Sequence, residues 1–144
     1  MPTQILNQEI YNNALALIAQ DINGKDIDDL EERAPYLIAS FCCSAKSIDK
    51  SIRKDEGLAE QKSFSSVYLS LNENFPLCST LSSPAALYVA AMLMIDEDPD
   101  LSDSLYDKYC NAMAPLAAIH QAVCDANRSA KTSCESIAEK YFFD

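Results

Sequence analysis

The chain has 144 residues, of which 49% are hydrophobic, and its formal net charge at pH 7 is −11. This length and hydrophobic content exclude a disordered chain and predict one domain with a real core. Only two glycines occur, which excludes a Gly-rich phosphate loop and argues against a turn-rich all-β fold. A pI near 4.3 argues against a surface that binds nucleic acid.

Two amphipathic helices are predicted in the first third of the chain. Apolar residues recur at helical spacing over residues 4–22, and an Asn-Gly pair ends this first helix. The second helix begins at Asp26 or Asp28, both good N-caps, and its apolar stripe runs over residues 27–52. Because the stripe keeps its phase across Pro35, we expect either one kinked helix or two nearly collinear helices.

One strand is predicted, after a polar surface loop over residues 55–63. Val67, Leu69 and Leu71 alternate with polar residues, which is the period of a half-buried strand. A lone strand cannot satisfy its own backbone hydrogen bonds. The segment therefore pairs with a hidden partner in the same chain, lies as an extended arm, or adds to a sheet in another subunit.

The central element is predicted between residues 82 and 97. Residues 85–95 carry no charge and are rich in Ala, Leu and Met, with Ser83 placed as the N-cap and Pro84 as the first helical residue. A helix that is apolar on every side must be buried on every side. Since a bilayer span needs ~20 such residues, we expect no membrane contact and a helix around which the others pack.

Two more helices are predicted towards the C-terminus. The fourth begins near residue 101 or 102, passes Pro115 in phase and ends near residue 127. A polar joint over residues 128–131 separates it from a short last helix over residues 132–140, and the chain then closes with aromatic residues.

These elements predict an all-α fold. We expect a small helical bundle around a buried central helix, with one extended arm or strand between the second and third main helices. The predicted divisions are a helical core domain over residues 1–131, which carries an extended insertion over residues 55–82, and a short C-terminal helix with an aromatic tail over residues 132–144.

Three patterns contain residue types that occur in metal or catalytic sites. The single histidine, His120, has Cys124 one turn later, but two ligands do not make a site. The acidic run from Asp96 to Asp107 has oxygen ligands at alternate positions, but it lacks the Gly and the bidentate Glu of a calcium loop. Acidic residues elsewhere stand at helix starts, where capping explains them. We therefore expect no catalytic residue, no metal, no cofactor and no enzyme activity.

The six cysteines are predicted to be free thiols in a reducing compartment. The N-terminus has no basic region followed by an apolar stretch, so no signal peptide is expected, and the cysteine spacing suits neither a disulfide framework nor a CxxC zinc site. The vicinal pair Cys42-Cys43 could be redox-active or metal-binding, but buried inert thiols are the expected state.

The order of these segments carries a family resemblance. Glu-Arg-Ala-Pro-Tyr-Leu-Ile-Ala-Ser-Phe-Cys-Cys (32–43) is followed by Phe-Pro-Leu (75–77), the Ala-rich helix (85–95), an acidic turn, Tyr-Asp-Lys-Tyr (106–109) and Ser-Ile-Ala-Glu-Lys-Tyr-Phe (136–142). This layout resembles the small, acidic, mostly helical proteins encoded near capsid and portal genes in tailed phages and prophages of Gram-positive bacteria. It is similar to the class of head–tail connectors, or head-completion adaptors.

The resemblance implies a structural virion protein of the neck, assembled in the cytoplasm of a bacterial host. It implies a homo-oligomeric ring docked below the portal protein, in contact with tail-side neck proteins, through whose channel DNA passes without specific binding. A net charge of −11 suits such a channel, because acidic walls repel phosphates. The competing hypothesis is a small cytosolic helical regulator or protein-binding module.

Two segments are predicted to contact other polypeptides. The strand lacks a second strand, and three aromatic residues at a terminus would be poorly placed in water. The alternative for the tail is that Phe142 folds back on the core of its own chain. The predicted partner-interface residues are Val67, Tyr68, Leu69, Leu71, Tyr141, Phe142 and Phe143.

Overall fold

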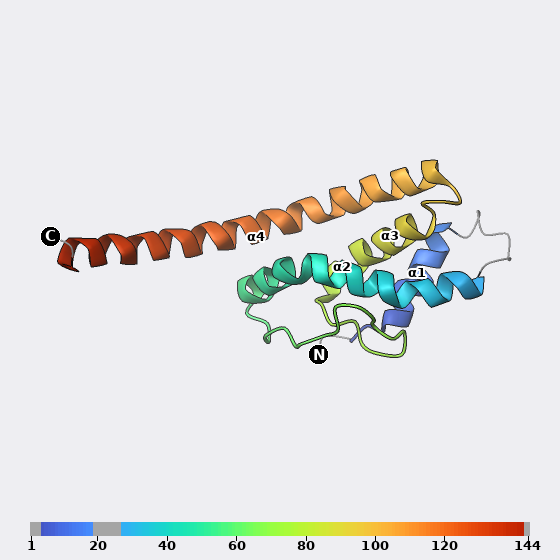
Figure 1. Cartoon of the computed structure of the whole chain (residues 1–144), viewed down its shortest axis with the longest axis horizontal. Coiled ribbons are helices and arrows are strands. Elements are labelled where there is room, and N and C mark those ends of the chain that lie inside the picture. The colour runs from blue at the N-terminus through green and yellow to red at the C-terminus, as the bar shows by residue number, and fades with distance from the viewer. Residues whose placement is uncertain (1–3, 19–26, 143–144) are drawn as a thin grey trace.

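The computed structural model describes the backbone of residues 4–18 and 27–142, and the side chains of residues 4–18 and 28–128. Within these ranges the chain forms α1 (Asn7–Ile18), α2 (Ile27–Glu56), a 3-10 helix η1 (Ser79–Leu81), α3 (Ser82–Leu93) and α4 (Pro99–Phe142). No strand occurs in them, so the predicted all-α fold is confirmed. Figure 1 shows α1, α2, α3 and the first part of α4 packed together, while the rest of α4 runs beyond them.

Helix α3 is the centre of the bundle, as predicted, because it contacts α1, α2 and α4. Its side chains are buried on several sides; Ala85, Val89 and Ala90 are fully inaccessible to solvent, and Leu93 is nearly so. The burial is not complete along the predicted segment: Leu87 is only partly buried, and Ile95 lies beyond the end of the helix with 51% of its surface exposed.

The start of α3 differs from the prediction. The helix begins at Ser82 rather than after a Ser83 cap, and no side chain caps its first N–H groups. The reason is that η1 precedes it directly, so the chain is already turning when α3 begins. The Ser82 hydroxyl instead donates a hydrogen bond to the Ser79 carbonyl at 2.6 Å.

Helix α2 resolves the alternatives left open at Pro35, because it is one helix of 30 residues with Pro35 inside it. It ends at Gly57, whose φ of 68° lies in the left-handed region that favours glycine. The Leu58 N–H then donates to the Arg53 carbonyl at 2.8 Å, which satisfies one of the last carbonyls of the helix.

Helix α4 is longer at both ends than predicted. It begins at Pro99, where the Asp98 carboxylate accepts a hydrogen bond from the Leu101 N–H at 3.1 Å, the geometry of an N-cap. The polar joint predicted over residues 128–131 is wrong, since the helix continues through it to Phe142. Arg-Ser-Ala-Lys contains no Gly or Pro and has good helix formers, so polarity alone was a poor signal for a break.

The predicted strand over residues 67–71 is also wrong, because this part of the arm between α2 and η1 has no regular secondary structure. Its backbone finds partners within the chain. The Leu69 N–H donates to the Pro35 carbonyl of α2 at 3.2 Å, and the Leu71 carbonyl accepts from the Gln8 N–H of α1 at 2.9 Å. A single antiparallel bridge joins Leu6 to Asn74.

One aromatic side chain of α2 packs against aromatic rings from the arm, α3 and α4. Phe41 of α2 is fully buried, and its ring centre lies 6.4 Å from that of Phe75 in the arm, 5.9 Å from Tyr88 of α3 and 6.1 Å from Tyr109 of α4. Aromatic pairs at these separations add to the stability gained by burial.

Candidate interaction surfaces

The arm over residues 57–78 is held on α2 by one buried carboxylate. Asp49 is fully buried, and its Oδ1 accepts a hydrogen bond from the Cys78 N–H at 2.7 Å. Its Oδ2 accepts from Arg53 Nε at 2.7 Å and from Gln61 Nε2 at 2.8 Å. The two ends of the arm therefore meet at one carboxyl group.

Arg53 extends this network to the backbone of the arm. Its two terminal nitrogens donate to the carbonyls of Ala59, at 3.0 Å, and Pro76, at 3.2 Å. The Gln61 amide donates a second hydrogen bond to the Lys46 carbonyl at 3.0 Å. The arm is thus a fixed part of the molecule that is fastened by polar contacts as well as by its apolar side chains.

The electrostatics of Asp49 follow from these contacts. Burial by itself would raise the pKa of the Asp49 carboxyl, but hydrogen bonds from Cys78, Gln61 and Arg53 favour the charged form and lower the pKa below its usual value. Burial raises the pKa of the Cys78 thiol to about 12, and the Asp49 carboxylate adds to this effect. Cys78 is therefore a protonated, structural thiol at neutral pH.

The structure divides the four predicted interface residues of the arm into two pairs. Leu69 and Leu71 are buried in the core of their own chain, with 3% and 8% of their surface exposed. Val67 and Tyr68 face solvent, with 64% and 46% exposed. Period-two alternation held for Leu69 and Leu71 and failed at Val67, which is in phase with them but exposed. The backbone of the buried pair is bonded to this chain's own α2 and α1.

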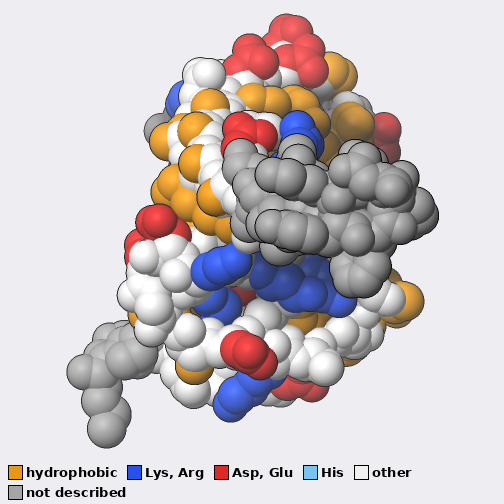
Figure 2. All heavy atoms as spheres, turned by 90° about the vertical axis from the view of Figure 1, so that its left-hand side faces the viewer, with side chains coloured by type: hydrophobic (Ala, Val, Ile, Leu, Met, Phe, Trp, Pro, Cys, Tyr) orange, Lys and Arg blue, Asp and Glu red, His pale blue; other side chains and the backbone are white. Residues whose placement is uncertain are grey.

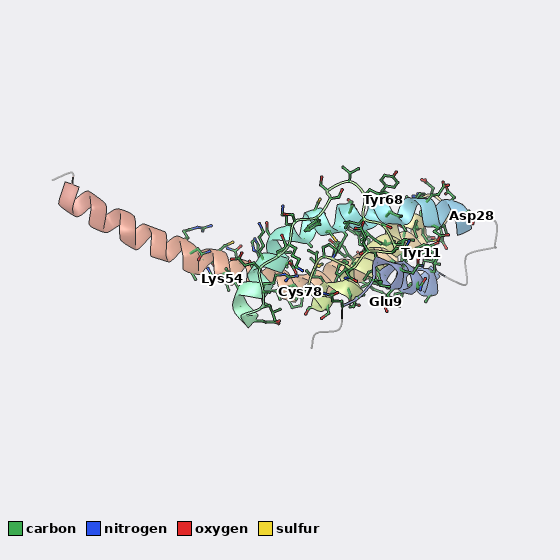
Figure 3. All side chains as sticks on the ribbon, turned by 90° about the horizontal axis from the view of Figure 1, so that it is seen from below. Glu9, Tyr11, Asp28, Lys54, Tyr68 and Cys78 are labelled. Carbon is green, nitrogen blue, oxygen red and sulfur yellow. The ribbon has the colours of Figure 1, made fainter. Side chains whose placement is uncertain are left out.

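Beside Tyr68 lies an open groove of about 720 Å³, here called the acidic groove. Its walls come from the N-terminal part of α2, with Asp28, Glu31, Glu32 and Tyr36, and from the arm, with Tyr68 and residues 70–72. Tyr36 is 54% exposed, and its ring meets that of Tyr68 edge-on, with 5.1 Å between the centres. In Figure 3, Asp28 and Tyr68 lie at the same end of α2.

No positive charge balances this groove from within. None of its lining residues is Lys or Arg, and among the described residues no ion pair involves Asp28, Glu31 or Glu32. Arg33, which follows Glu32 in the sequence, donates instead to the Met92 carbonyl of α3 at 3.4 Å. Sequence reasoning assigned these carboxylates to helix capping alone and did not foresee that the arm would place Tyr68 beside them and beside Tyr36.

The opposite end of α2 is basic. Lys46, Lys50 and Lys54 recur every four residues and are all exposed, so they share one face of the helix; we call them the basic stripe. Figure 2 shows Lys and Arg side chains gathered in the middle of the face at this end of the molecule. Lys54 also donates to Asn127 Oδ1 of α4 at 3.1 Å.

The His120–Cys124 pair is part of the contact between α4 and α2. His120 Nδ1 shares a hydrogen bond with the buried Ser51 hydroxyl at 2.7 Å, and Cys124 Sγ lies 3.6 Å from His120 Nε2. Across the described ranges, His, Cys, Asp and Glu side chains nowhere gather in a group of three that would hold a metal ion.

The vicinal cysteines point to different surroundings, as expected from adjacent helical positions. Cys42 is fully buried in the core, and burial raises the pKa of its thiol well above the usual value. Cys43 is exposed and lies 3.5 Å from the Ser66 carbonyl of the arm. Cys78, Cys110 and Cys124 are also free thiols in the described part of the chain.

The last predicted interface segment is only partly described. The backbone of Tyr141 and Phe142 belongs to α4, whereas their side chains, and all of Phe143, lie outside the described residues. Figure 1 shows that this end of α4 extends past the C-terminal end of α2 without another element of the chain beside it. We call residues 129–142 the α4 extension.

None of the helices, over the residues described, combines the length and apolar character needed to cross a membrane. Comparison of the chain with protein-family models, with curated proteins and with solved structures finds no match.

Proposed function

We propose that this chain is a structural assembly protein, a head–tail connector or head-completion adaptor of a tailed phage or prophage. In this proposal identical subunits form a ring below the portal protein, contact the tail-side neck proteins and enclose part of the DNA channel. The segment order over residues 32–142 supports the family, and one structural feature, the α4 extension, supports the role in assembly.

The α4 extension is a feature that a monomer does not account for. Helix α4 has 44 residues, which corresponds to ~66 Å. Its last described contact with the body is the Lys54–Asn127 hydrogen bond, and the extension adds ~21 Å beyond it. A helical segment of ~14 residues is marginal in water without tertiary packing, so a second polypeptide beside the extension would stabilise it.

The charge of the chain is compatible with a DNA channel. Each subunit carries a net charge of −11, and a ring multiplies this charge around its axis. Acidic walls repel phosphates and would let DNA pass without holding it. Carboxylates cluster in two described places, in the acidic groove and over residues 96–107, which span the turn after α3 and the first turns of α4.

The alternative is a small cytosolic helical regulator or protein-binding module. The observation that favours it is the acidic groove, since exposed tyrosines beside carboxylates could take a basic peptide. The two hypotheses differ in oligomeric state, because a regulator of this kind works as a monomer that binds another protein, whereas a connector forms or joins a ring.

The experiment that separates them is a mass measurement on the purified chain. Mass photometry and negative-stain microscopy should show rings whose mass is a multiple of 15.9 kDa, either alone or after co-expression with the portal protein of the same genome. A particle that remains a monomer at all concentrations, and does not bind the portal protein, would contradict the connector and favour the regulator.

A further inference from the structure

We propose that copies of this chain join head to tail, with the basic stripe of one copy in the acidic groove of the next. This inference rests on the proposed function, because it names the contact by which identical subunits would form a ring. The occupant of the groove is therefore a second copy of the same chain.

The first argument is that the two surfaces cannot meet within one chain. Asp28 and Lys54 stand near opposite ends of α2 (Figure 3), which places them ~39 Å apart along a continuous helix. Among the described residues, no ion pair involves the carboxylates of the groove or the lysines of the stripe. Because every copy carries both surfaces, association brings opposite charges together.

The second argument is the match between the side chains of the two surfaces. The basic stripe offers three ammonium groups over ~12 Å of helix, and the groove offers the carboxylates of Asp28, Glu31 and Glu32. The exposed rings of Tyr36 and Tyr68 can pack against the methylene groups of a lysine and make a cation–π contact with its ammonium group. The chain already shows this pairing, since Lys46 Nζ lies 5.7 Å from the ring centre of Phe64.

The third argument concerns symmetry. A contact between two different patches is heterologous, so each copy has one groove and one stripe left for further neighbours. Repetition of such a contact closes into a ring when the rotation between neighbours divides a full turn, and it gives an open filament when it does not. Head-to-tail contact thus fits a ring, whereas a self-complementary contact between two copies ends at a dimer.

The test uses charge reversal in the full-length protein. One variant, Glu31→Lys with Glu32→Lys, makes the groove basic; a second, Lys50→Glu with Lys54→Glu, makes the stripe acidic. Each should weaken self-association at least tenfold, because its groove and stripe then carry the same sign. Mixed in equal amounts, the two variants should assemble again, because each surface then meets its opposite on the other variant.

The matched control is Asp103→Lys with Asp107→Lys, which changes the net charge of the chain as the groove variant does. Both residues are exposed on α4 and outside both surfaces, so assembly should persist. Mass photometry measures all four samples, and circular dichroism checks that each is folded.

Three results would overturn the inference in different ways. If the wild-type chain forms rings and both reversed variants form them equally well, the head-to-tail contact is wrong while the connector proposal stands. If the wild-type chain remains a monomer under all conditions, both proposals fail, and binding of a Lys-rich peptide to its groove would assign the groove to another protein. If the mixture stops at a closed heterodimer, the contact is self-complementary and the head-to-tail arrangement is wrong.

Discussion

Among the described residues, Asp49 carries the only fully buried carboxylate group. This carboxylate joins α2 to both ends of the arm. Its removal would leave the Cys78 N–H and Arg53 Nε without their acceptor and would take one of two acceptors from the Gln61 amide. Breaking a buried charge pair from one side is strongly destabilising, because the remaining partner stays desolvated.

Asp49→Ala is therefore expected to lower the free energy of unfolding by ~3–5 kcal/mol. Urea denaturation followed by circular dichroism measures this change. Asp55→Ala, at an exposed position near the end of the same helix, is the control and should change stability by less than ~0.5 kcal/mol. Equal effects of the two substitutions would show that the Asp49 network does not hold the arm.

The pH dependence of this effect has a definite sign. The pKa of Asp49 is lowered in the folded state from its ordinary value of 3.8, so its stabilising contribution is complete above that pH and is lost as the pH falls below it. The stability difference between wild type and Asp49→Asn should therefore shrink between pH 5 and pH 2. A difference that stays constant over this range would contradict a lowered pKa.

At this scale the sequence predicted side-chain burial better than side-chain partners. The alternation over residues 67–71 correctly set Leu69 and Leu71 apart from their neighbours, yet nothing local showed that α1 and α2 would cover them. Asp49 was missed, although it follows Ile48 on the edge of the apolar stripe and has Arg53 one turn later. A carboxylate at that position with an arginine four residues later indicates a side-chain ion pair at the edge of the core.

Among the elements, α3 carries the largest share of fully buried side chains for its length. A charge placed there would be buried without a partner, at a cost comparable with the ~5–15 kcal/mol total stability of a domain. Val89→Asp and Leu93→Asp are expected to unfold the protein, as judged by the loss of helical circular dichroism and of a cooperative melting transition.

Ile95→Asp provides the control for these two variants, because Ile95 lies just beyond α3 and is exposed. It introduces the same charge and should leave the melting temperature almost unchanged. If Val89→Asp and Leu93→Asp stay soluble and cooperatively folded, then α3 is not the element on which the bundle depends.

The helices themselves could be predicted because their signals are local. Apolar spacing, capping residues and Gly57 are all read within a few positions, and the stripes correctly crossed Pro35 and Pro115. The errors came where long-range packing decides the outcome. The arm has a strand-like pattern, but its backbone groups pair with α1 and α2 rather than with a strand. Helix α4 continues through a polar segment that was predicted as a break, because this segment contains no helix breaker.

At the scale of the whole molecule, neither the acidic groove nor the α4 extension could be predicted from the sequence. Tyr68 of the arm is more than thirty residues away in the sequence from the carboxylates and Tyr36 of α2, and only the path of the arm brings it to the same groove. Helix α4 was likewise predicted as two helices separated by a joint over residues 128–131, which concealed how far one helix runs beyond the bundle.

The extension gives the last prediction. Ending the chain after Arg128 removes the α4 extension and the aromatic tail but keeps the described contacts of α4 with α2, including His120 with Ser51 and Lys54 with Asn127. The monomer's melting temperature should therefore change little, while self-association should weaken, because the proposed assembly places a neighbouring polypeptide beside the extension. Differential scanning fluorimetry and mass photometry measure the two effects separately.

A full-length control separates the helix from its aromatic end. Tyr141→Ser, Phe142→Ser and Phe143→Ser together keep the length of the chain and remove only the three rings, each Phe of which could contribute ~1.5–3 kcal/mol on burial. Loss of association in this variant would place the rings in the contact; loss only on truncation would assign the contact to the helix before them. A large fall in melting temperature with assembly intact would instead mean that the extension stabilises its own chain, because a part that serves only the interface cannot lower the monomer's stability when it is removed.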